Sequence, residues 1–190
     1  MLYYSMPALA AGFILDLMIG DPRWLYHPVC LIGNLIAFLE KILRKIFPKT
    51  DKGELAAGTV EVILVCLLSG GIPFLILHIL YGISVWAGFA LETFWCYQLL
   101  ATKSLKTESM KVYEALSTGT LEDGRYAVSM IVGRDTKALS EEGVIKATVE
   151  TVAENTSDGV IAPMLYMAIG GVPLMFLYKG INTMDSMVGY

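Results

Sequence analysis

The stretch E-T-V-A-E-N-T-S-D-G-V-I-A-P-M-L-Y-M-A-I-G-G-V-P-L-M-F-L-Y, residues 150–178, joins an acidic polar segment to an apolar one. Its apolar part is about as long as the ~20 helical residues that a bilayer crossing needs. Directly beyond it the chain reads K-G-I-N-T-M-D-S, residues 179–186, so polar side chains stand at both ends of one apolar segment. Ionisable residues placed in this way are typical of catalysis or transport.

The composition is that of a membrane protein. Of the 190 residues, 55% are hydrophobic and 17% are charged, and the mean hydropathy is +0.60, whereas about a quarter of the residues in a soluble domain are charged. The net charge of -4 and the lack of a basic run interleaved with aromatics argue against a nucleic-acid partner. The three cysteines have no metal-site or redox spacing. We therefore expect an all-α, polytopic helical membrane protein that packs against the lipid bilayer.

Apolar segments long enough to cross a bilayer predict one span at residues 2–20, two within 56–101 and one at 159–178. The first has Asp16 as its only charge, which either reaches the interface by snorkelling or has a functional role. The turn inside the second segment is expected either at 70–73 or near 81–82. Glu61 and Glu92 lie within reach of the ends of this hairpin, where snorkelling is expected.

The last apolar segment contains helix breakers at Gly170, Gly171 and Pro173. Non-helical backbone at membrane depth is tolerated where it lines a cavity or is buried in protein. A straight helix of about 20 residues would hold its ends about 30 Å apart, which is too far for polar groups at both ends to share ligands. A broken or re-entrant span is therefore the prediction on which a shared site depends.

Residues 29–47 have apolar side chains at spacings of three and four with charged side chains between them, which predicts an amphipathic helix, either interfacial or tightly docked, that is ended by Pro48. Five basic residues fall within 41–52, so the positive-inside rule places this connection in the cytoplasm.

Residues 102–158 are polar but show helical periodicity. Gly119 is expected to separate two helices, and Ser140 is expected to cap a third. If the preceding hairpin crosses twice, this helical polar region is also cytoplasmic. With no linker to a second soluble domain, residues 1–190 are expected to form a single membrane-embedded domain.

Two connections carry charged side chains. In D-P-R-W-L-Y-H-P, residues 21–28, either Asp21, Arg23 and His27 face a polar substrate or the segment is interfacial, and for His27 a structural role is favoured. In V-G-R-D-T, residues 132–136, Arg134 and Asp135 stand side by side, as they would in an ordinary solvated turn.

Glu150, Glu154 and Asp158 are spaced by four, so two of them share a helix face, while residues 155–159 predict a helix end and a turn. The groups that could hold Mg²⁺ through oxygen ligands and neutralise phosphate are the carboxylates of Glu154, Asp158 and Asp185, the amides of Asn155 and Asn182, and Lys179. The same groups could equally bind a translocated cation.

The runs D-P-R-W-L-Y-H-P-V-C-L-I-G, I-V-G-R-D-T, V-E-T-V-A-E-N-T-S-D-G-V-I-A-P, G-G-V-P and Y-K-G-I-N-T-M-D-S-M-V-G-Y closely resemble the adenosylcobinamide-phosphate synthase family of cobalamin biosynthesis, in the family's order along the whole chain. The resemblance implies an integral membrane enzyme that condenses a corrinoid, adenosylcobyric acid, with an amino-alcohol phosphate such as (R)-1-amino-2-propanol O-phosphate in an ATP-dependent amide ligation. It also implies that family members continue beyond Tyr190, so this chain is expected to be an N-terminal portion.

The positions that match the family's polar blocks are Asp21, Pro22, His27, Pro28, Arg134, Asp135, Thr136, Glu154, Asn155, Thr156, Asp158, Lys179, Asn182, Thr183, Asp185 and Ser186. Under this hypothesis Glu154, Asp158 and Asp185 hold the Mg²⁺ of ATP. Lys179 and Arg134 neutralise charge in phosphoryl transfer. Asp135 or His27 takes a proton from the attacking ammonium.

The remaining matched polar residues are expected to bind the cofactor: Asn155, Thr156, Asn182, Thr183 and Ser186. An enzyme of this kind is expected in the cell inner membrane, crossing it several times, with its polar clusters facing the cytoplasm, where ATP is found. The alternative is a polytopic sensor or a small-solute or ion transporter, which would use the same acids near the middle of the bilayer.

Overall fold

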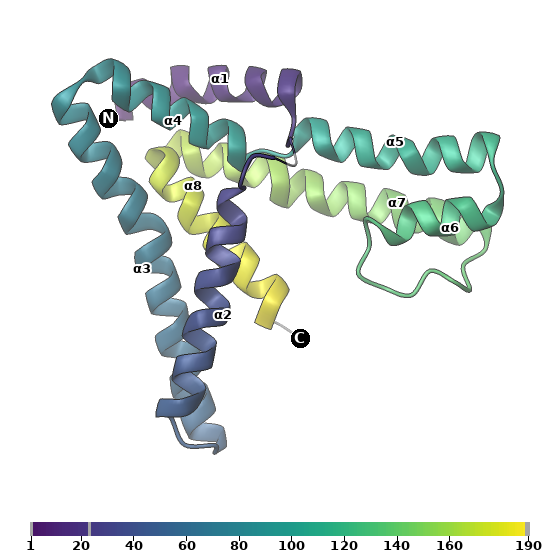
Figure 1. The fold of residues 1–190 in the computed structure, drawn as a ribbon, viewed down its shortest axis with the longest axis horizontal. Helices are drawn as coiled ribbons and strands as arrows, with labels where there is room; N and C mark the ends of the chain where they lie inside the picture. The colour runs from purple at the N-terminus through teal and green to yellow at the C-terminus, as the bar shows by residue number, and fades with distance from the viewer. Residues whose placement is uncertain (1, 23, 189–190) are drawn as a thin grey trace.

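The computed structural model describes residues 2–22 and 24–188, and these form helices and connections without a strand (Figure 1). In chain order the elements are α1 (Leu2–Ile19), α2 (Pro28–Ile46), α3 (Asp51–Ile83), α4 (Val85–Leu99), α5 (Thr102–Thr118), α6 (Leu121–Ser129), α7 (Glu141–Thr156), the π-helical turn η1 (Ser157–Ile161) and α8 (Ala162–Val188). The predicted all-α class is confirmed.

Three helical segments of the described chain are long and apolar enough to cross a membrane: α1, α3 and the segment Glu141–Val188, which comprises α7, η1 and α8. The polytopic membrane character is thereby confirmed. The turn within the second apolar segment lies at Ser84, which caps α4, and Pro73 lies inside α3. With 15 residues, α4 extends about 22 Å and is shorter than the ~30 Å hydrocarbon core.

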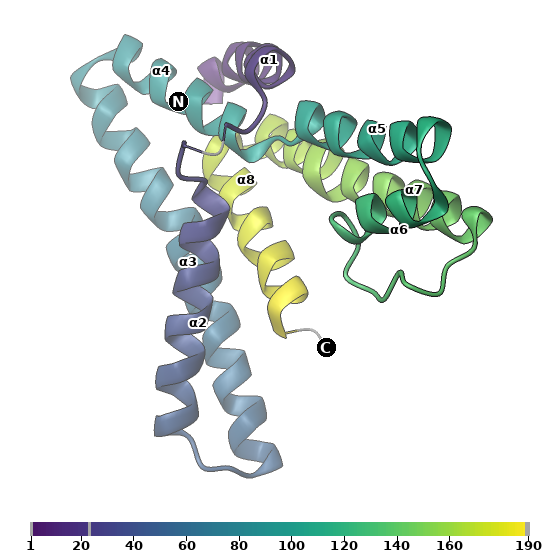
Figure 2. The same ribbon diagram turned by 45° about the vertical axis from the view of Figure 1, so that its right-hand side comes forward.

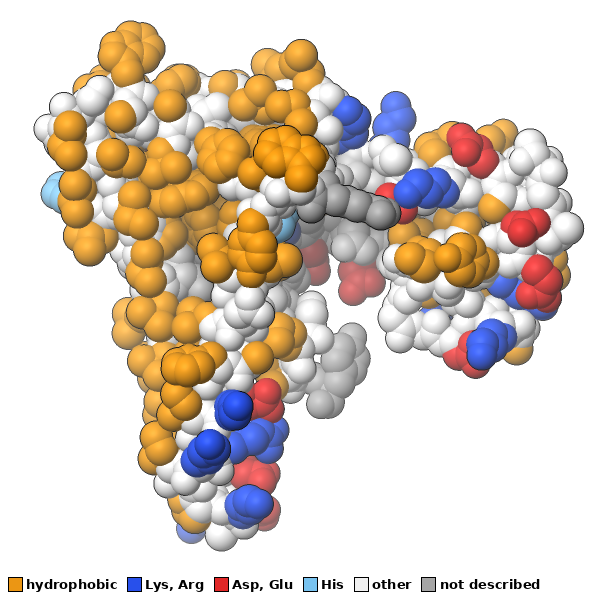
Figure 3. Space-filling view, in the orientation of Figure 1, with side chains coloured by type: hydrophobic (Ala, Val, Ile, Leu, Met, Phe, Trp, Pro, Cys, Tyr) orange, Lys and Arg blue, Asp and Glu red, His pale blue; other side chains and the backbone are white. Residues whose placement is uncertain are grey.

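The helices form an apolar body and a polar arm (Figures 1 and 2). The body contains α1, α2, α3, α4 and α8, which share a core that includes Ala8, Ile36, Leu77, Cys96 and Met175. The arm contains α5, α6 and α7 and has a second core of Val112, Val128, Val144 and Ala147. Apolar side chains cover the visible face of the body, whereas charged ones gather on the arm and at the α2–α3 end (Figure 3).

Three of the expected helix boundaries lie near the predicted residues. Gly119 is the C-cap of α5, Ser140 caps α7 through its hydroxyl, and the amphipathic α2 ends at Ile46, before Pro48. Such ends are decided by nearest neighbours in the chain, because a cap satisfies backbone groups within one turn.

Asp16 joins the body to the arm. Its side chain is fully buried, and its Oδ2 accepts a 2.8 Å hydrogen bond from the backbone N–H of Thr102 in the first turn of α5. A carboxylate there is favoured by the free N–H groups and by the helix dipole. Nearby, the backbone N–H of Ala101 donates to the carbonyl of Gly159 over 3.2 Å. Asp16 therefore has a structural role, and snorkelling is excluded.

The span ending near Tyr178 is broken at Gly171, as expected. Gly171 has φ 69° and ψ -170°, a region of backbone conformation that is essentially restricted to glycine. The chain turns back sharply there, so that the second half of α8 runs beside α2 and α3 (Figures 1 and 2). The ends of this apolar segment are consequently not held apart as a straight helix would hold them.

Two acids expected to snorkel are instead buried inside the body. Glu92 is fully buried, and it accepts hydrogen bonds from Ser5 Oγ at 2.7 Å and from the Tyr81 hydroxyl at 2.5 Å. A Cβ at Gly171 would lie 2.9 Å from Ser5 Oγ and 3.1 Å from Glu92 Oε1. The polar group of Ser5, Tyr81 and Glu92 thus packs against the corner of α8. The second acid, Glu61, is 6% exposed.

Candidate functional site

The acidic segment does not end in a turn, contrary to the expectation for residues 155–159. The helix continues through η1, where the backbone N–H of Ala162 donates to the carbonyl of Ser157. A π-turn inserts an extra residue into the helical repeat and is frequent at functional sites. Here the π-turn η1 connects α7 directly to α8, and Asp158 within it lies half-buried where the arm meets the body.

Asp158 is the centre of the polar cluster. Its Oδ1 accepts a hydrogen bond from the Tyr178 hydroxyl at 3.2 Å, and its Oδ2 accepts one from Asn182 Nδ2 at 3.1 Å. Lys179 Nζ donates to the backbone carbonyl of Asp158 over 3.0 Å. The two polar ends of the apolar segment therefore meet directly, because the Gly171 corner folds the second half of α8 back toward η1.

Lys179 is buried, with 7% of its surface exposed. An ammonium group has three N–H donors, and the hydrogen bond to Asp158 accounts for one of them. A buried ammonium without further acceptors is costly. Lys179 is therefore suited to bind an anionic group that enters this cluster.

The connection between α1 and α2 brings a second acid and a histidine to the same neighbourhood. Asp21 Oδ1 lies 3.9 Å from His27 Nε2, the charge of Lys179 acts on His27, and the charge of Asp21 acts on Lys179. A cavity of about 300 Å³ opens beside them and is lined by Asp21, Pro22, Leu25, Tyr26, His27, Cys30, Tyr97 and Gln98. Arg23 lies outside the described residues.

His27 is held as the N-cap of α2. Its Nδ1 accepts the backbone N–H of Val29 at 3.2 Å, so the neutral ring carries its proton on Nε2, which faces Asp21. Burial lowers the pKa of His27 below 6.5; the positive charge of Lys179 adds to this shift, while Asp21 opposes it. The Nδ1 lone pair is already used by the cap, so Asp21 is better placed than His27 to accept a proton in this arrangement.

The three carboxylates expected to share Mg²⁺ are not brought together. Glu154 is exposed on α7, Asp158 is bound by Tyr178 and Asn182, and Asp185 is exposed on α8. Within residues 2–22 and 24–188, no group of three or more His, Cys, Asp or Glu side chains could hold a metal ion. Glu154 and Asp158 are one helical turn apart in sequence, and the broken span was expected to bring Asp185 to them, but the three carboxylates do not converge in the fold.

Arg134 and Asp135 belong to the arm. Arg134 Nη2 donates to Glu150 Oε2 over 2.9 Å, and Asp135 Oδ1 accepts the backbone N–H of Lys137 at 3.0 Å. Thr136 is buried and donates to the carbonyl of Arg125. The loop joins α6 to α7 and runs beside these two helices (Figure 1). These contacts hold the loop in place and do not join it to Lys179.

The hydroxyls and amides expected to bind the cofactor do not all lie in the Asp158 cluster. Thr183 and Ser186 donate to carbonyls one turn back on α8, and Asn155 Nδ2 donates to the carbonyl of Thr151 on α7. Thr156 is exposed. Of the five residues expected to bind the cofactor, Asn182 is the one joined to Asp158 by a hydrogen bond.

Tyr178 and Gln98 were not named as candidate site residues from the sequence, and Asp21 was named only as a residue that either faces a polar substrate or lies at the interface. Tyr178 immediately precedes Lys179 and was counted as part of the apolar span. Asp21 was one of several charges in a proline-bracketed connection. Gln98, whose Nε2 donates to the carbonyl of Tyr26, had no local signal. The adjacency of Tyr178 to K-G-I-N was the one cue that could have indicated a hydroxyl within the cluster.

The family model and the similar proteins found by comparison point to the same family. The family model described as CobD/Cbib protein matches residues 9–190. Proteins named cobalamin biosynthesis protein CobD are similar to this chain, with 49% identity over 96% of it in Clostridium tetani, 50% over 93% in Clostridium acetobutylicum and 41% over 98% in Klebsiella pneumoniae. The chain covers 57%, 56% and 58% of these relatives, respectively. No solved structure matches it significantly.

Proposed function

This chain belongs to the CobD/Cbib protein family, and from that premise we propose that it is the membrane-embedded part of a cobalamin-biosynthesis enzyme. The chain spans little more than half the length of the curated relatives described above. The proposed reaction of the whole protein is an ATP-dependent amide ligation. It joins the carboxylate of adenosylcobyric acid to the amine of an amino-alcohol phosphate such as (R)-1-amino-2-propanol O-phosphate, giving adenosylcobinamide phosphate.

The observation that carries this proposal is the meeting of Asp158 with Tyr178, Lys179 and Asn182 across the broken span. A strained glycine and a π-turn together bring an acid, an amide and a buried ammonium into one cluster. Uncommon backbone conformations of this kind are often retained at functional sites. A merely solvated acidic surface would need neither of them.

The cluster offers separate places for the two reacting groups. Lys179, with N–H donors left over, is suited to the carboxylate or to a phosphate of the reactants. Asp21, half-exposed beside His27, is suited to hold the amine as an ammonium and to accept its proton before it attacks. Forming an amide requires an activated carboxylate and the exclusion of water, and the burial of Lys179 supports the second condition.

ATP and Mg²⁺ remain part of the proposal as the source of carboxylate activation. Mg²⁺ is commonly held by one or two carboxylates together with phosphate oxygens and water. The predicted set of Glu154, Asp158 and Asp185 does not form a shared site here, so the fit is poor and no step is assigned to the metal. Asp158 is the one of the three that lies in the cluster.

The test uses the full-length protein with Asp158→Asn and, separately, Lys179→Gln. We expect each to lower ATP-dependent formation of adenosylcobinamide phosphate by about 100-fold, since loss of a preorganised charge at a reacting group has effects of that order. Glu114→Gln, an exposed change on the arm, should have no effect. Near-normal turnover in both cluster variants, with normal amounts of folded protein, would refute the proposed site.

We also propose that the protein resides in the cell inner membrane with the α2–α3 connection and the arm on the cytoplasmic side. The five basic residues within 41–52 support this orientation. Reporter domains fused after Lys52 and after Lys137 test it. Both fusions should report a cytoplasmic position, and a periplasmic position for either one contradicts the orientation.

A further inference from the structure

The first turn of α5 is capped by a residue from another helix. Its own N-cap residue is Ala101, which makes no side-chain cap hydrogen bond within the described part of the chain. The acceptor comes instead from Asp16 of α1, whose fully buried carboxylate binds the N–H of Thr102 through Oδ2. The Oδ1 of Asp16 is buried without a donor among the described residues, which is costly. A serine or aspartate at position 101 would cap α5 without burying a carboxylate, so the place of Asp16 needs a further explanation.

Residues 101–104, which we call the junction turn, hold the connection that carries Asp21. Lys103 Nζ donates to the carbonyl of Met18 over 2.5 Å, at the end of α1. Ser104 Oγ accepts the backbone N–H of Asp21 at 3.3 Å. The position of Asp21 is therefore tied to the start of α5.

The junction turn is also joined to η1. The backbone N–H of Ala101 donates to the carbonyl of Gly159 over 3.2 Å, and a Cβ built on Gly159 would lie 3.5 Å from the Cβ of Ala101. Gly159 directly follows Asp158, whose carbonyl binds Lys179. The charges of Asp158 and Asp21 both act on Lys179. The same turn thus contacts the segments that carry both of these acids.

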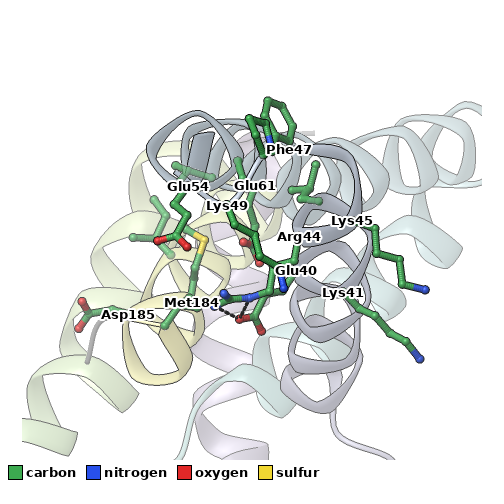
Figure 4. A pocket seen from close by; sticks show the side chains of 17 residues that line it. Glu40, Lys41, Arg44, Lys45, Phe47, Lys49, Glu54, Glu61, Met184 and Asp185 are labelled. Carbon is green, nitrogen blue, oxygen red and sulfur yellow. Dashed lines mark hydrogen bonds and ion pairs between the residues drawn. The ribbon is translucent and has the colours of Figure 1, made fainter. Parts of the chain in front are cut away.

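The second half of α8 borders open space away from the Asp158 cluster. A cavity of about 960 Å³ lies between this half, α2 and α3. Met184 and Asp185 are among the side chains that line it (Figure 4), whereas Lys179 and Asn182 bind Asp158 and do not line it. Open space of this kind can take up a displacement of α8, so the geometry of the cluster depends on how the junction turn holds η1.

We propose that Asp16 is a positioning residue of the Asp158 cluster. Through the junction turn it sets where Asp21 and Asp158 lie relative to Lys179, and because it is fully buried it touches no reactant itself. This inference rests on the proposed ligation, in which Asp21 holds the amine and Lys179 an anionic group. Misplacement of a reacting group by about 1 Å can lower a rate by about 100-fold, so a loss of positioning is measurable.

Three variants of the full-length protein separate position from charge. Asp16→Asn keeps an oxygen at the same distance, Asp16→Glu keeps the charge but lengthens the side chain by one methylene, and Asp16→Ala removes the link. Turnover per amount of folded protein should fall within about threefold for Asp16→Asn and by about tenfold or more for the other two. If Asp16→Glu were as active as Asp16→Asn, the charge would matter and not the position, and the inference would be overturned.

A disulfide can replace the missing link. The Cβ separation of 3.5 Å between positions 101 and 159 suits a disulfide, so Ala101→Cys with Gly159→Cys should oxidise with copper–phenanthroline once the exposed Cys30 is changed to serine. In the Asp16→Ala protein, oxidation should raise turnover by about fivefold or more, and reduction should reverse the gain. Val144→Ala, which weakens the core of the arm, is the control, and the same oxidation should not raise its turnover. No gain in Asp16→Ala, or an equal gain in the control, contradicts the inference.

The rate of disulfide formation tests the geometry without any reactant. It should be slower in Asp16→Ala than with Asp16 intact, because the junction turn is no longer held to α1, and equal rates overturn the inference. A slower rate in a protein that shows no ligation even when unaltered would support the role of Asp16 and reject the proposed function. If Asp16→Ala does not fold, the comparison of Asp16→Asn with Asp16→Glu decides the matter.

Discussion

At the scale of the residue, the hydroxyl of Tyr178 is one of the two side-chain donors that, within the described residues, hold the Asp158 carboxylate. It was not apparent from the sequence, because a tyrosine at the end of an apolar span is ordinarily an interfacial residue. Its ring also stacks on Tyr166, with ring centroids 4.8 Å apart. The packing of the ring and the hydrogen bond can therefore be separated experimentally.

Tyr178→Phe should keep the stacked ring and lose the hydrogen bond to Asp158. We expect the ligation rate of the full-length protein to fall by about threefold to tenfold, as for the loss of one ordinary hydrogen bond. Tyr166→Phe is the matched control, since no hydrogen bond from its hydroxyl is seen within the described residues and its ring makes the same stack. Equal activities of the two variants would show that the Tyr178 hydroxyl is dispensable.

His27 predicts a pH dependence of stability. Because its pKa in the folded protein is lowered below 6.5, the unfolded chain binds more protons than the folded one between the two pKa values. The stabilisation is therefore complete above pH 6.5 and is lost as pH falls toward the folded pKa. The unfolding midpoint in detergent should decrease as the pH is lowered from about 7.5 to about 5.5, the range in which histidines titrate.

His27→Asn should flatten that part of the profile, because asparagine retains a good N-cap acceptor for α2 but does not titrate. His27→Ala should flatten it as well and also lower stability by about 1 kcal/mol through loss of the cap. An unchanged slope in His27→Asn would assign the pH dependence to other groups.

At the scale of the element, α8 depends on the backbone of Gly171. Its conformation excludes side chains, and a Cβ would press on Ser5 and Glu92. Gly171→Ala should destabilise the protein by about 1–3 kcal/mol, and it should also impair ligation because it shifts Lys179 relative to Asp158. Thermal unfolding and turnover of the full-length protein measure the two effects.

Gly71→Ala provides the comparison for this substitution. Gly71 lies inside α3 with no atom within 4 Å of an added Cβ, so alanine should stabilise the helix by up to about 1 kcal/mol and leave turnover unchanged. If Gly171→Ala behaved like Gly71→Ala, the corner of α8 would not be required for the site.

At the scale of the whole molecule, the separate cores of body and arm predict separate local stabilities. Val144→Ala in the arm should cost about 2 kcal/mol by removing buried methyl groups and should speed hydrogen exchange in α5, α6 and α7 while leaving α3 protected. Val65→Ala in the body should have the reverse distribution. Uniform loss of protection in both variants would mean that the molecule opens as a single unit.

The sequence by itself determined the helical membrane class, the C-terminal end of α5, the start of α7 and the position of the break in the last span. These features follow from composition, from caps within one turn and from a glycine that follows another glycine. Local chemistry also identified Asp158, Lys179 and Asn182 as members of one site, although Glu154, Asp185 and the Arg134 loop were grouped with them because they are also charged.

Only the tertiary structure decided which of those residues meet. The π-turn and the Gly171 corner bring Asp158 to Lys179 and Asn182, whereas Glu154 and Asp185 remain exposed and outside this cluster. Likewise, Asp16, which is 86 residues before Thr102, caps α5. Such contacts depend on how distant helices pack, and residue spacing along one helix carries no information about the face that another helix will cover.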